Sequence, residues 1–272
     1  MILTKENIQQ LIQYDQILHN WGRIIGDVGK RYISTKADDI HTNFIFNAKT
    51  NQLEGRPFTT QKGNYFIAFN IQRNSFIFYE SDSKVATASI SVSQAYFHII
   101  KQMQNILVDL GIAQSNCPEV IEFRHSQHFD IDGYIPEISE EIKGIWITLR
   151  DGANKILEEA LNTLNIEGEV RIWPTNFDTG VFYDYNNGYQ QWIGLASADD
   201  EVIDVPYFYN AISLNGEKIR PENFEDLNDG YWSYNDWNGA VLPIDNFENT
   251  NKFLDAASSF IPESTNKLLN HK

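Results

Sequence analysis

Apolar residues switch from a helical period to a strand period and back again, twice, along this 272-residue chain. From Lys5 to about Ile33 they recur at helical spacing, and between residues 41 and 91 they alternate as in strands. A second amphipathic helix is expected from near Ser93 to Gly111, where a glycine suits a left-handed terminal position. The first half is therefore predicted to be a helix, an antiparallel sheet and a helix.

The second half repeats this order. A long helix is predicted from Pro136, which suits a first helical position, to Gly168. Strand-like segments separated by Asn-Gly turns fill residues 169–244. A last helix is predicted to end at Pro262, with a frayed tail after it, because proline cannot continue the backbone hydrogen bonds.

These patterns predict an α+β fold in which two similar helix, antiparallel sheet, helix halves pack as one compact domain. The halves are expected to be residues 1–116 and 117–272. The shared order of elements also predicts an internal duplication.

Local glycine and turn chemistry adds detail to this scheme. Gly22, Gly26 and Gly29 predict a break in the first helix. The segment NQLEG at 51–55 is expected to be a turn between strands.

The charge of the chain excludes several classes of partner. A formal net charge of −16 repels phosphate backbones and anionic lipids, so we expect neither nucleic acid nor membrane binding. The single cysteine excludes an intrachain disulfide, and the polar N-terminal residues lack an apolar signal core. We therefore expect a cytoplasmic protein.

Cofactor and metal motifs are missing from the sequence. Neither a GxGxxG nor a GxSxG motif occurs, and we expect no cofactor. The densest group of potential metal ligands is His128, Asp130 and Asp132, which would share one face of an extended segment. Because they match no established metal motif, we expect no metal, and a divalent metal at these residues stays as the alternative.

The segment from Asp229 to Gly239 combines aromatic rings with Asp, Asn and Gly residues and has no clean period. A regular strand cannot bury all of its rings, so it is expected to be a loop with exposed rings such as Trp232 and Trp237. Such a loop suits a lid over a ligand or a docking surface for a protein partner.

Several segments together resemble a bacterial family of domains of unknown function, over most of the chain from Trp21 to Pro243. The chain departs from that family at Thr42 and Asn43, where the family has aromatic residues, and at 179–188, where the family has a basic segment. The segments that carry the resemblance are Trp21, Gly29-Lys30, His41, Leu110-Gly111-Ile112, Phe129-Asp130-Ile131-Asp132, Trp173, Phe177-Asp178 and Gly230-Tyr231-Trp232.

The resemblance implies a set of ligand-binding residues whose types suit a mixed aromatic and polar pocket. They are Trp21, Lys30, His41, Trp173, Asp178 and Trp232.

Three functions are compatible with these residues. The favoured one is binding of a small polar ligand in a cleft between the halves, by a protein that is either non-enzymatic or cryptically enzymatic. The second is hydrolysis of a sugar or ester through Asp178 and His41 as general acid and base. The third is a protein-interaction module that uses the aromatic segment 229–239.

Overall fold

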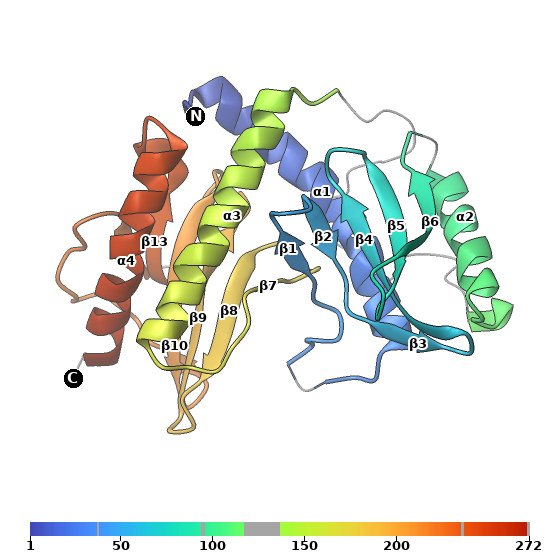
Figure 1. The fold of residues 1–272 in the computed structure, drawn as a ribbon. Helices are drawn as coiled ribbons and strands as arrows, with labels where there is room; N and C mark the ends of the chain where they lie inside the picture. Colours follow the sequence, from blue (N-terminus) through green and yellow to red (C-terminus); the bar gives the residue numbers. More distant parts are fainter. Residues whose placement is uncertain (37, 94–95, 117–136, 235–236, 271–272) are drawn as a thin grey trace. The chain divides into compact units, whose positions relative to one another are not determined.

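The computed structural model describes residues 1–36, 38–93, 96–116, 137–234 and 237–270. Its helices and two antiparallel sheets confirm the predicted α+β class (Figure 1). The helices are α1 (Lys5–Tyr32), α2 (Tyr96–Asp109), α3 (Glu140–Thr163) and α4 (Thr250–Asn270), with short 3₁₀ turns η1 (Gln114–Asn116) and η2 (Ile244–Asn246). None of the helices in this described part combines the length and the apolar run that crossing a bilayer requires.

The chain divides into two compact units. The α2 unit contains Gln16–Ser139 and Ile172–Phe177, and the α4 unit contains Met1–Asp15, Glu140–Arg171 and Asp178–Lys272. The division falls within helix α1 and differs from the predicted halves 1–116 and 117–272. The internal duplication stays a prediction.

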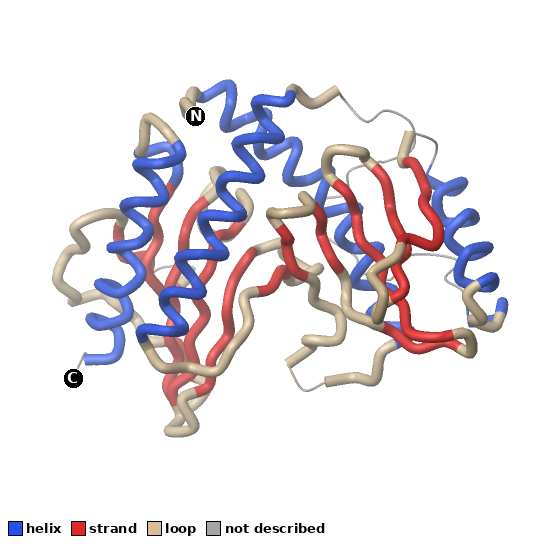
Figure 2. Tube along the Cα trace, in the orientation of Figure 1, coloured by secondary structure: helices blue, strands red, loops and turns tan. Residues whose placement is uncertain are grey.

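The α2 unit is built on a six-stranded sheet with strand order β1-β2-β4-β5-β6, and β3 pairs with β4 (Figure 2). Trp21 of α1 packs against Phe69 and Phe76 of this sheet and forms the centre of the unit's core. The strands are β1 (Ile45–Asn47), β2 (Gln52–Glu54), β3 (Phe58–Thr60), β4 (Gly63–Asn70), β5 (Ser75–Glu80) and β6 (Ala86–Ser91).

One predicted turn of this unit is wrong. NQLEG contains strand β2, in which Leu53 pairs with Phe46 on β1 and with Phe69 on β4. All three side chains are buried, so packing within the sheet outweighs the turn preference of the flanking Asn and Gly residues.

The predicted break in the first helix is also wrong, because α1 runs unbroken through its glycines. A Cβ atom at Gly22 would lie 2.7 Å from the Phe44 ring, and one at Gly29 would collide with the His41 carbonyl oxygen. These glycines allow close packing within the α2 unit and do not interrupt the helix.

The end of α2 confirms the sequence prediction. Gly111 has φ +97°, and the Ile112 amide donates to the Leu107 carbonyl, which is the hydrogen bond of a glycine-terminated helix. The helix begins at Tyr96.

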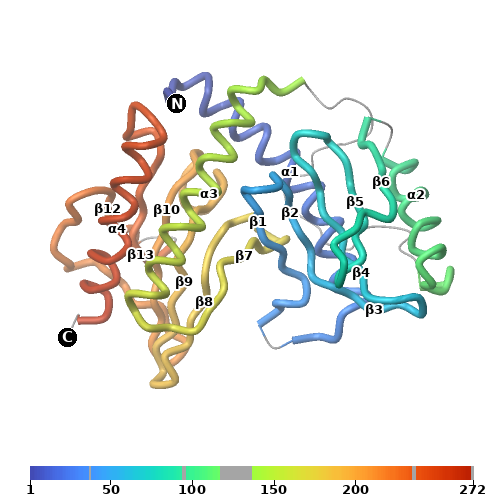
Figure 3. The backbone as a smooth tube through the Cα atoms, viewed as in Figure 1, coloured from blue at the N-terminus to red at the C-terminus, as the bar shows by residue number. Residues whose placement is uncertain are grey.

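The α4 unit is built on a seven-stranded sheet with order β12-β13-β10-β9-β8-β7, and β11 pairs with β10 (Figure 3). Helices α3 and α4 lie side by side over one face of this sheet, where Phe208 on β10 packs against Phe253 on α4 (Figure 1). The strands are β7 (Arg171–Ile172), β8 (Thr179–Asp184), β9 (Tyr189–Ala196), β10 (Tyr207–Leu214), β11 (Glu217–Lys218), β12 (Tyr231–Tyr234) and β13 (Asn238–Pro243).

Helix α3 is shorter than predicted at both ends. Residues 137–139 are not helical, so the helix begins at Glu140, whose charge favours the first turn, and Pro136 lies outside the described residues. At the other end Asn165, not Gly168, takes the left-handed position, with φ +52°.

Helix α4 corrects the prediction of an end at Pro262 and a frayed tail. It continues through Pro262 to Asn270. Ser264 and Thr265 accept hydrogen bonds from buried Asn210 at 2.9 and 2.8 Å, and Leu268 is 1% exposed. These contacts hold the turns that follow the proline, which lacks the backbone N–H group of a regular helix residue.

The aromatic segment 229–239 is a hairpin strand for much of its length, so the prediction of an irregular loop is wrong. Strand β12 pairs with β13, with Tyr231 opposite Val241. Tyr231 and Tyr234 are 41% and 36% exposed, whereas Trp232 and Trp237 are partly buried.

Candidate functional site

Polar side chains gather at one end of three neighbouring strands of the α4 unit. Asp178 precedes β8, Ser197 follows β9 and Tyr207 begins β10. Because β9 runs antiparallel to both neighbours, its end lies beside the starts of β8 and β10. The register therefore brings these residues to the same edge, which we call the strand-end site.

Asp178 and Tyr209 form the centre of the strand-end site. The Tyr209 hydroxyl donates a 2.5 Å hydrogen bond to Asp178 Oδ2. The phenol reaches across β9, because a Cβ atom at Gly194 would lie 2.7 Å from its oxygen and one at Gly180 would lie 3.0 Å away. Glycine is thus required at both cross-strand positions, where any larger side chain would displace the ring.

The surroundings shift the pKa of both groups upward. Asp178 is partly exposed as a residue, but burial of its carboxyl group raises its pKa, while the hydrogen bond from Tyr209 and the charge of Arg150 act in the opposite direction. Burial and the Asp178 charge raise the pKa of Tyr209 well above its usual value. Tyr209 therefore stays a hydrogen-bond donor, and Asp178 holds its proton to a higher pH than an ordinary aspartate.

A buried ion pair supports the site from the helices. Arg150 on α3 donates through Nη2 to Asp15 Oδ1 on α1 at 2.8 Å and through Nη1 to Thr179 Oγ1 at 2.8 Å. Trp146 Nε1 also donates to Asp15 Oδ1 at 2.6 Å, and Ser197 donates to Asp15 Oδ2. Both charged residues are buried, and this set of hydrogen bonds compensates for their removal from water.

A second tyrosine and carboxylate pair flanks the first. The Tyr207 hydroxyl donates to Asp199 Oδ2 at 2.6 Å, and burial, followed by this hydrogen bond and the Asp199 charge, raises the pKa of Tyr207. Asp199 Oδ1 accepts the backbone amides of Glu201 and Val202 at 2.9 and 2.7 Å, which orients the carboxylate.

Partly buried aromatic rings border the site on the same sheet face. Trp237 stands edge-on to Tyr209 with ring centroids 6.3 Å apart, and Lys218 Nζ lies 5.7 Å from the Trp237 centroid. The arrangement offers a carboxyl group, phenols and ring surface together, which is the mixture that recognises small molecules carrying hydroxyl groups.

The predicted ligand-binding residues are divided between the two units. Trp21, Lys30, His41 and Trp173 belong to the α2 unit, and Asp178 and Trp232 belong to the α4 unit.

Within the α2 unit, packing accounts for two of these residues. Trp21 is 1% exposed and is a core residue between aromatic rings. His41 is buried, and its Nδ1 accepts the Lys36 amide at 3.3 Å. Lys30 is exposed, next to the glycine that contacts the His41 carbonyl, and Trp173 is partly exposed.

Within the α4 unit, Asp178 and Trp232 are not brought together. Strands β9, β10 and β13 separate β8 from β12, a distance of about 19 Å at ordinary strand spacing. Trp232 Nε1 donates to the Glu225 carbonyl at 2.8 Å, and its ring packs edge-on against Phe224. Trp232 therefore fastens its own loop and is not part of the strand-end site.

The alternative metal ligands His128, Asp130 and Asp132 lie outside the described residues. Within residues 1–36, 38–93, 96–116, 137–234 and 237–270, no cluster of three or more His, Cys, Asp or Glu side chains is arranged to hold a metal ion.

Sequence reasoning singled out Asp178 but missed the other residues of the strand-end site and the ion pair that supports it. Tyr209 contacts Asp178, and Arg150, Asp15 and Ser197 contact one another; they come from separate elements that only the strand register and helix packing bring together. The glycines at 180 and 194 are the available signal, since two strand glycines facing one tyrosine indicate a ring crossing the backbone.

The resemblance to a bacterial family of domains of unknown function stays a prediction. Comparisons of the chain with family models, with curated proteins and with solved structures gave no match.

Proposed function

We propose that the α4 unit binds a small polar molecule rich in hydroxyl groups at the strand-end site. The observation that carries the proposal is the 2.5 Å hydrogen bond from the Tyr209 hydroxyl to the carboxyl group of Asp178, a residue that is partly exposed. A carboxyl group next to a ring fixes the direction of a hydroxyl while the ring contacts the carbon skeleton.

The surroundings of Asp178 support binding of a neutral or weakly charged molecule. Arg150, the cation within electrostatic reach of Asp178, already donates to Asp15 and Thr179. A ligand with a strong negative charge would meet the carboxyl groups of Asp178 and Asp199, and the chain carries a net charge of −16. Sugars, polyols and nucleosides fit this chemistry better than phosphates do.

A thermal-shift and calorimetric screen against monosaccharides, polyols and nucleosides tests the proposal. We expect at least one compound to raise the melting temperature, because a molecule that binds only the folded chain stabilises it. The Asp178→Asn variant should lose this shift. The matched control is Asp151→Asn on α3, which changes a carboxyl group that pairs with Lys155. This variant should keep the ligand-induced rise in melting temperature.

The raised pKa of Asp178 favours a second candidate, hydrolysis of a sugar or ester. A carboxyl group that keeps its proton closer to neutral pH suits a general acid. His41, the predicted second group, belongs to the α2 unit. If the chain is a hydrolase, we expect it to release nitrophenol from nitrophenyl glycosides or esters, and we expect Asp178→Asn and His41→Gln to abolish this release. Ligand binding without release of nitrophenol supports the first proposal.

We also propose a cytoplasmic location. The single cysteine and the acidic composition support it, because the first fits a reducing compartment and the second a soluble chain.

A further inference from the structure

Strand β12 forms one end of the seven-stranded sheet. Among the described residues it pairs with β13 alone, so its other edge presents backbone N–H and C=O groups. Its residues, Tyr231 to Tyr234, include neither lysine nor proline, which many proteins place on edge strands to prevent further pairing. Tyr231 and Tyr234 are 41% and 36% exposed. This edge is therefore open to an added strand.

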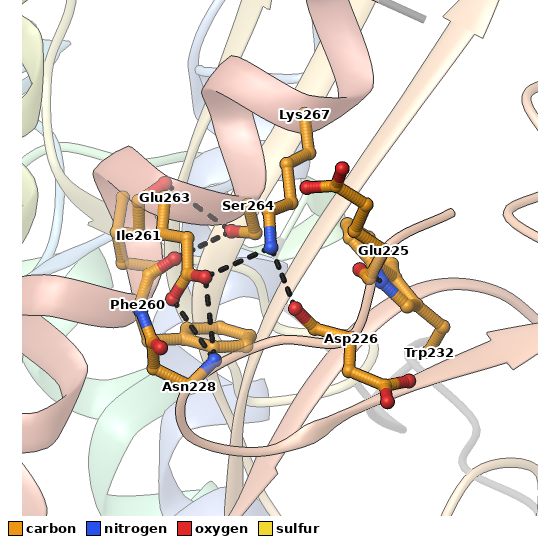
Figure 4. A network of polar contacts seen from close by, with 9 residues as sticks. All are labelled: Glu225, Asp226, Asn228, Trp232, Phe260, Ile261, Glu263, Ser264 and Lys267. Atoms are coloured by element: carbon orange, nitrogen blue, oxygen red, sulfur yellow. Dashed lines mark hydrogen bonds and ion pairs between the residues drawn. The ribbon is translucent and has the colours of Figure 1, made fainter.

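Helix α4 holds the loop that leads into β12 (Figure 4). Lys267 Nζ donates to the Asp226 carbonyl at 2.6 Å and to Glu263 Oε1 at 3.0 Å. The backbone N–H group of Asn228 donates to the two carboxylate oxygens of Glu263, at 3.3 and 3.2 Å. These contacts order the loop before any partner arrives, which lowers the entropic cost of binding.

Trp232 connects the strand to the same loop. Its Nε1 donates to the Glu225 carbonyl, and Figure 4 shows the indole beside that residue. The strand edge and the loop thus form one ordered surface, which we call the β12 edge.

Acidic side chains border the β12 edge. Glu225 and Asp226 are exposed, and the contacts described above use their backbone carbonyls. Asp245 is exposed and, after burial, is the second cause of the raised pKa of Tyr231. Of the nearby basic residues, Arg220 and Lys267 pair with Glu222 and Glu263, and Lys218 lies over the Trp237 ring, so the acidic residues outnumber the unpaired basic charge. The local charge is therefore negative.

We propose that the β12 edge binds an extended basic segment of another protein as an additional strand. Main-chain hydrogen bonds to β12 would supply the affinity, and lysine or arginine side chains would meet Glu225, Asp226 and Asp245. Two copies of this chain would bring the same acidic residues together at this edge, so charge favours a basic partner over self-association.

Fluorescence anisotropy with a dye-labelled peptide tests this inference on the full chain. The probe is a peptide of alternating lysine and valine, about six residues long, which matches an ordinary strand. A peptide of alternating lysine and proline carries the same charge but lacks half of the backbone donors, so it is the matched control probe. We expect binding of the first peptide, weakened by salt, and much weaker binding of the second.

Charge variants locate the site. Glu225→Gln with Asp226→Asn leaves both backbone carbonyls in place and should weaken peptide binding about fivefold. Glu158→Gln with Glu159→Gln removes the same charge from exposed positions on α3 and should leave binding unchanged. Equal losses in the two double variants would show attraction to the acidic chain as a whole and would overturn the inference.

Proline variants test the edge itself. Successive N–H groups point to opposite sides of a strand, so one of Ser233→Pro and Tyr234→Pro removes an N–H group that points away from β13. That variant should keep its melting temperature and lose the peptide. Binding that survives in both proline variants would place the peptide elsewhere.

Hydrogen exchange on the unaltered chain provides a measurement that needs no variant. The peptide should slow amide exchange within β12 and leave β6, an end strand of the other sheet, unchanged. Absence of binding, unchanged exchange in β12, or a β12-dependent dimer in place of peptide binding would each contradict the proposal.

Discussion

The hydroxyl of Tyr209 crosses the backbone of Gly194 to donate a 2.5 Å hydrogen bond to Asp178. This contact joins the start of β8 to β10 over the intervening strand and places a carboxyl group with a raised pKa beside aromatic rings. The proposed ligand site depends on it.

The raised pKa of Asp178 predicts how stability changes with pH. A carboxyl group with a higher pKa in the folded chain stabilises the fold while protonated, and this contribution is lost as pH rises from the ordinary aspartate value through the raised one. The side chain of the Asp178→Asn variant cannot ionise. Its free energy of unfolding should therefore increase relative to that of the unaltered chain as the pH rises through this range. Urea midpoints across about pH 4 to pH 8 measure it, and a pH-independent difference would contradict the assignment.

The glycine below the Tyr209 ring predicts a steric effect. Gly194→Ala should lower the free energy of unfolding by about 1 to 3 kcal/mol, because the new methyl group collides with the phenol and with the Thr179 carbonyl. The control is Gly144→Ala on α3, whose new Cβ would meet the Met1 side chain, with Sδ at 3.3 Å; it should be neutral or stabilising. Denaturant unfolding of both variants checks this, and equal effects would argue against the packing of Tyr209.

The buried pair of Arg150 and Asp15 predicts strong coupling. Arg150→Leu should cost about 3 to 5 kcal/mol, because it leaves the Asp15 carboxylate buried without its cation. Adding Asp15→Asn should recover part of that loss, so the double variant should be more stable than the sum of the single changes predicts. Strictly additive unfolding free energies would contradict the ion pair.

The continuation of α4 beyond Pro262 predicts a cost for truncating its last buried side chain. Leu268→Ala should destabilise the chain by about 2 to 5 kcal/mol, since Leu268 is 1% exposed. Asn270→Ala, at an exposed position in the same turn, is the control and should change little. Thermal unfolding of both variants distinguishes a packed helix end from a frayed tail.

The sequence predicted what depends on local patterns. The period of apolar residues located the helices and most strands, and Gly111 marked the end of α2. These features follow from side chains that are close together along the chain.

Features that depend on distant contacts were not predictable. Pro262 indicated a helix end, but Asn210 on β10 holds the residues that follow it. Gly22 indicated a break in the helix, but the helix is unbroken, and the glycine is there because the Phe44 ring leaves no room for a Cβ atom. Asp178 was singled out through the resemblance to a family, whereas Tyr209 was not, because pairing the two requires the strand register.

The proposed ligand site is tested most directly by an NMR titration of the chain carrying ring-labelled tyrosine. The Tyr209 signal is assigned with Tyr209→Phe, and the same panel of sugars, polyols and nucleosides is added. We predict that one compound shifts the Tyr209 signal to saturation, leaves exposed Tyr234 unchanged and has no effect on Tyr209 in Asp178→Asn. A panel that leaves Tyr209 unmoved, or moves Tyr209 and Tyr234 alike, would contradict the proposal.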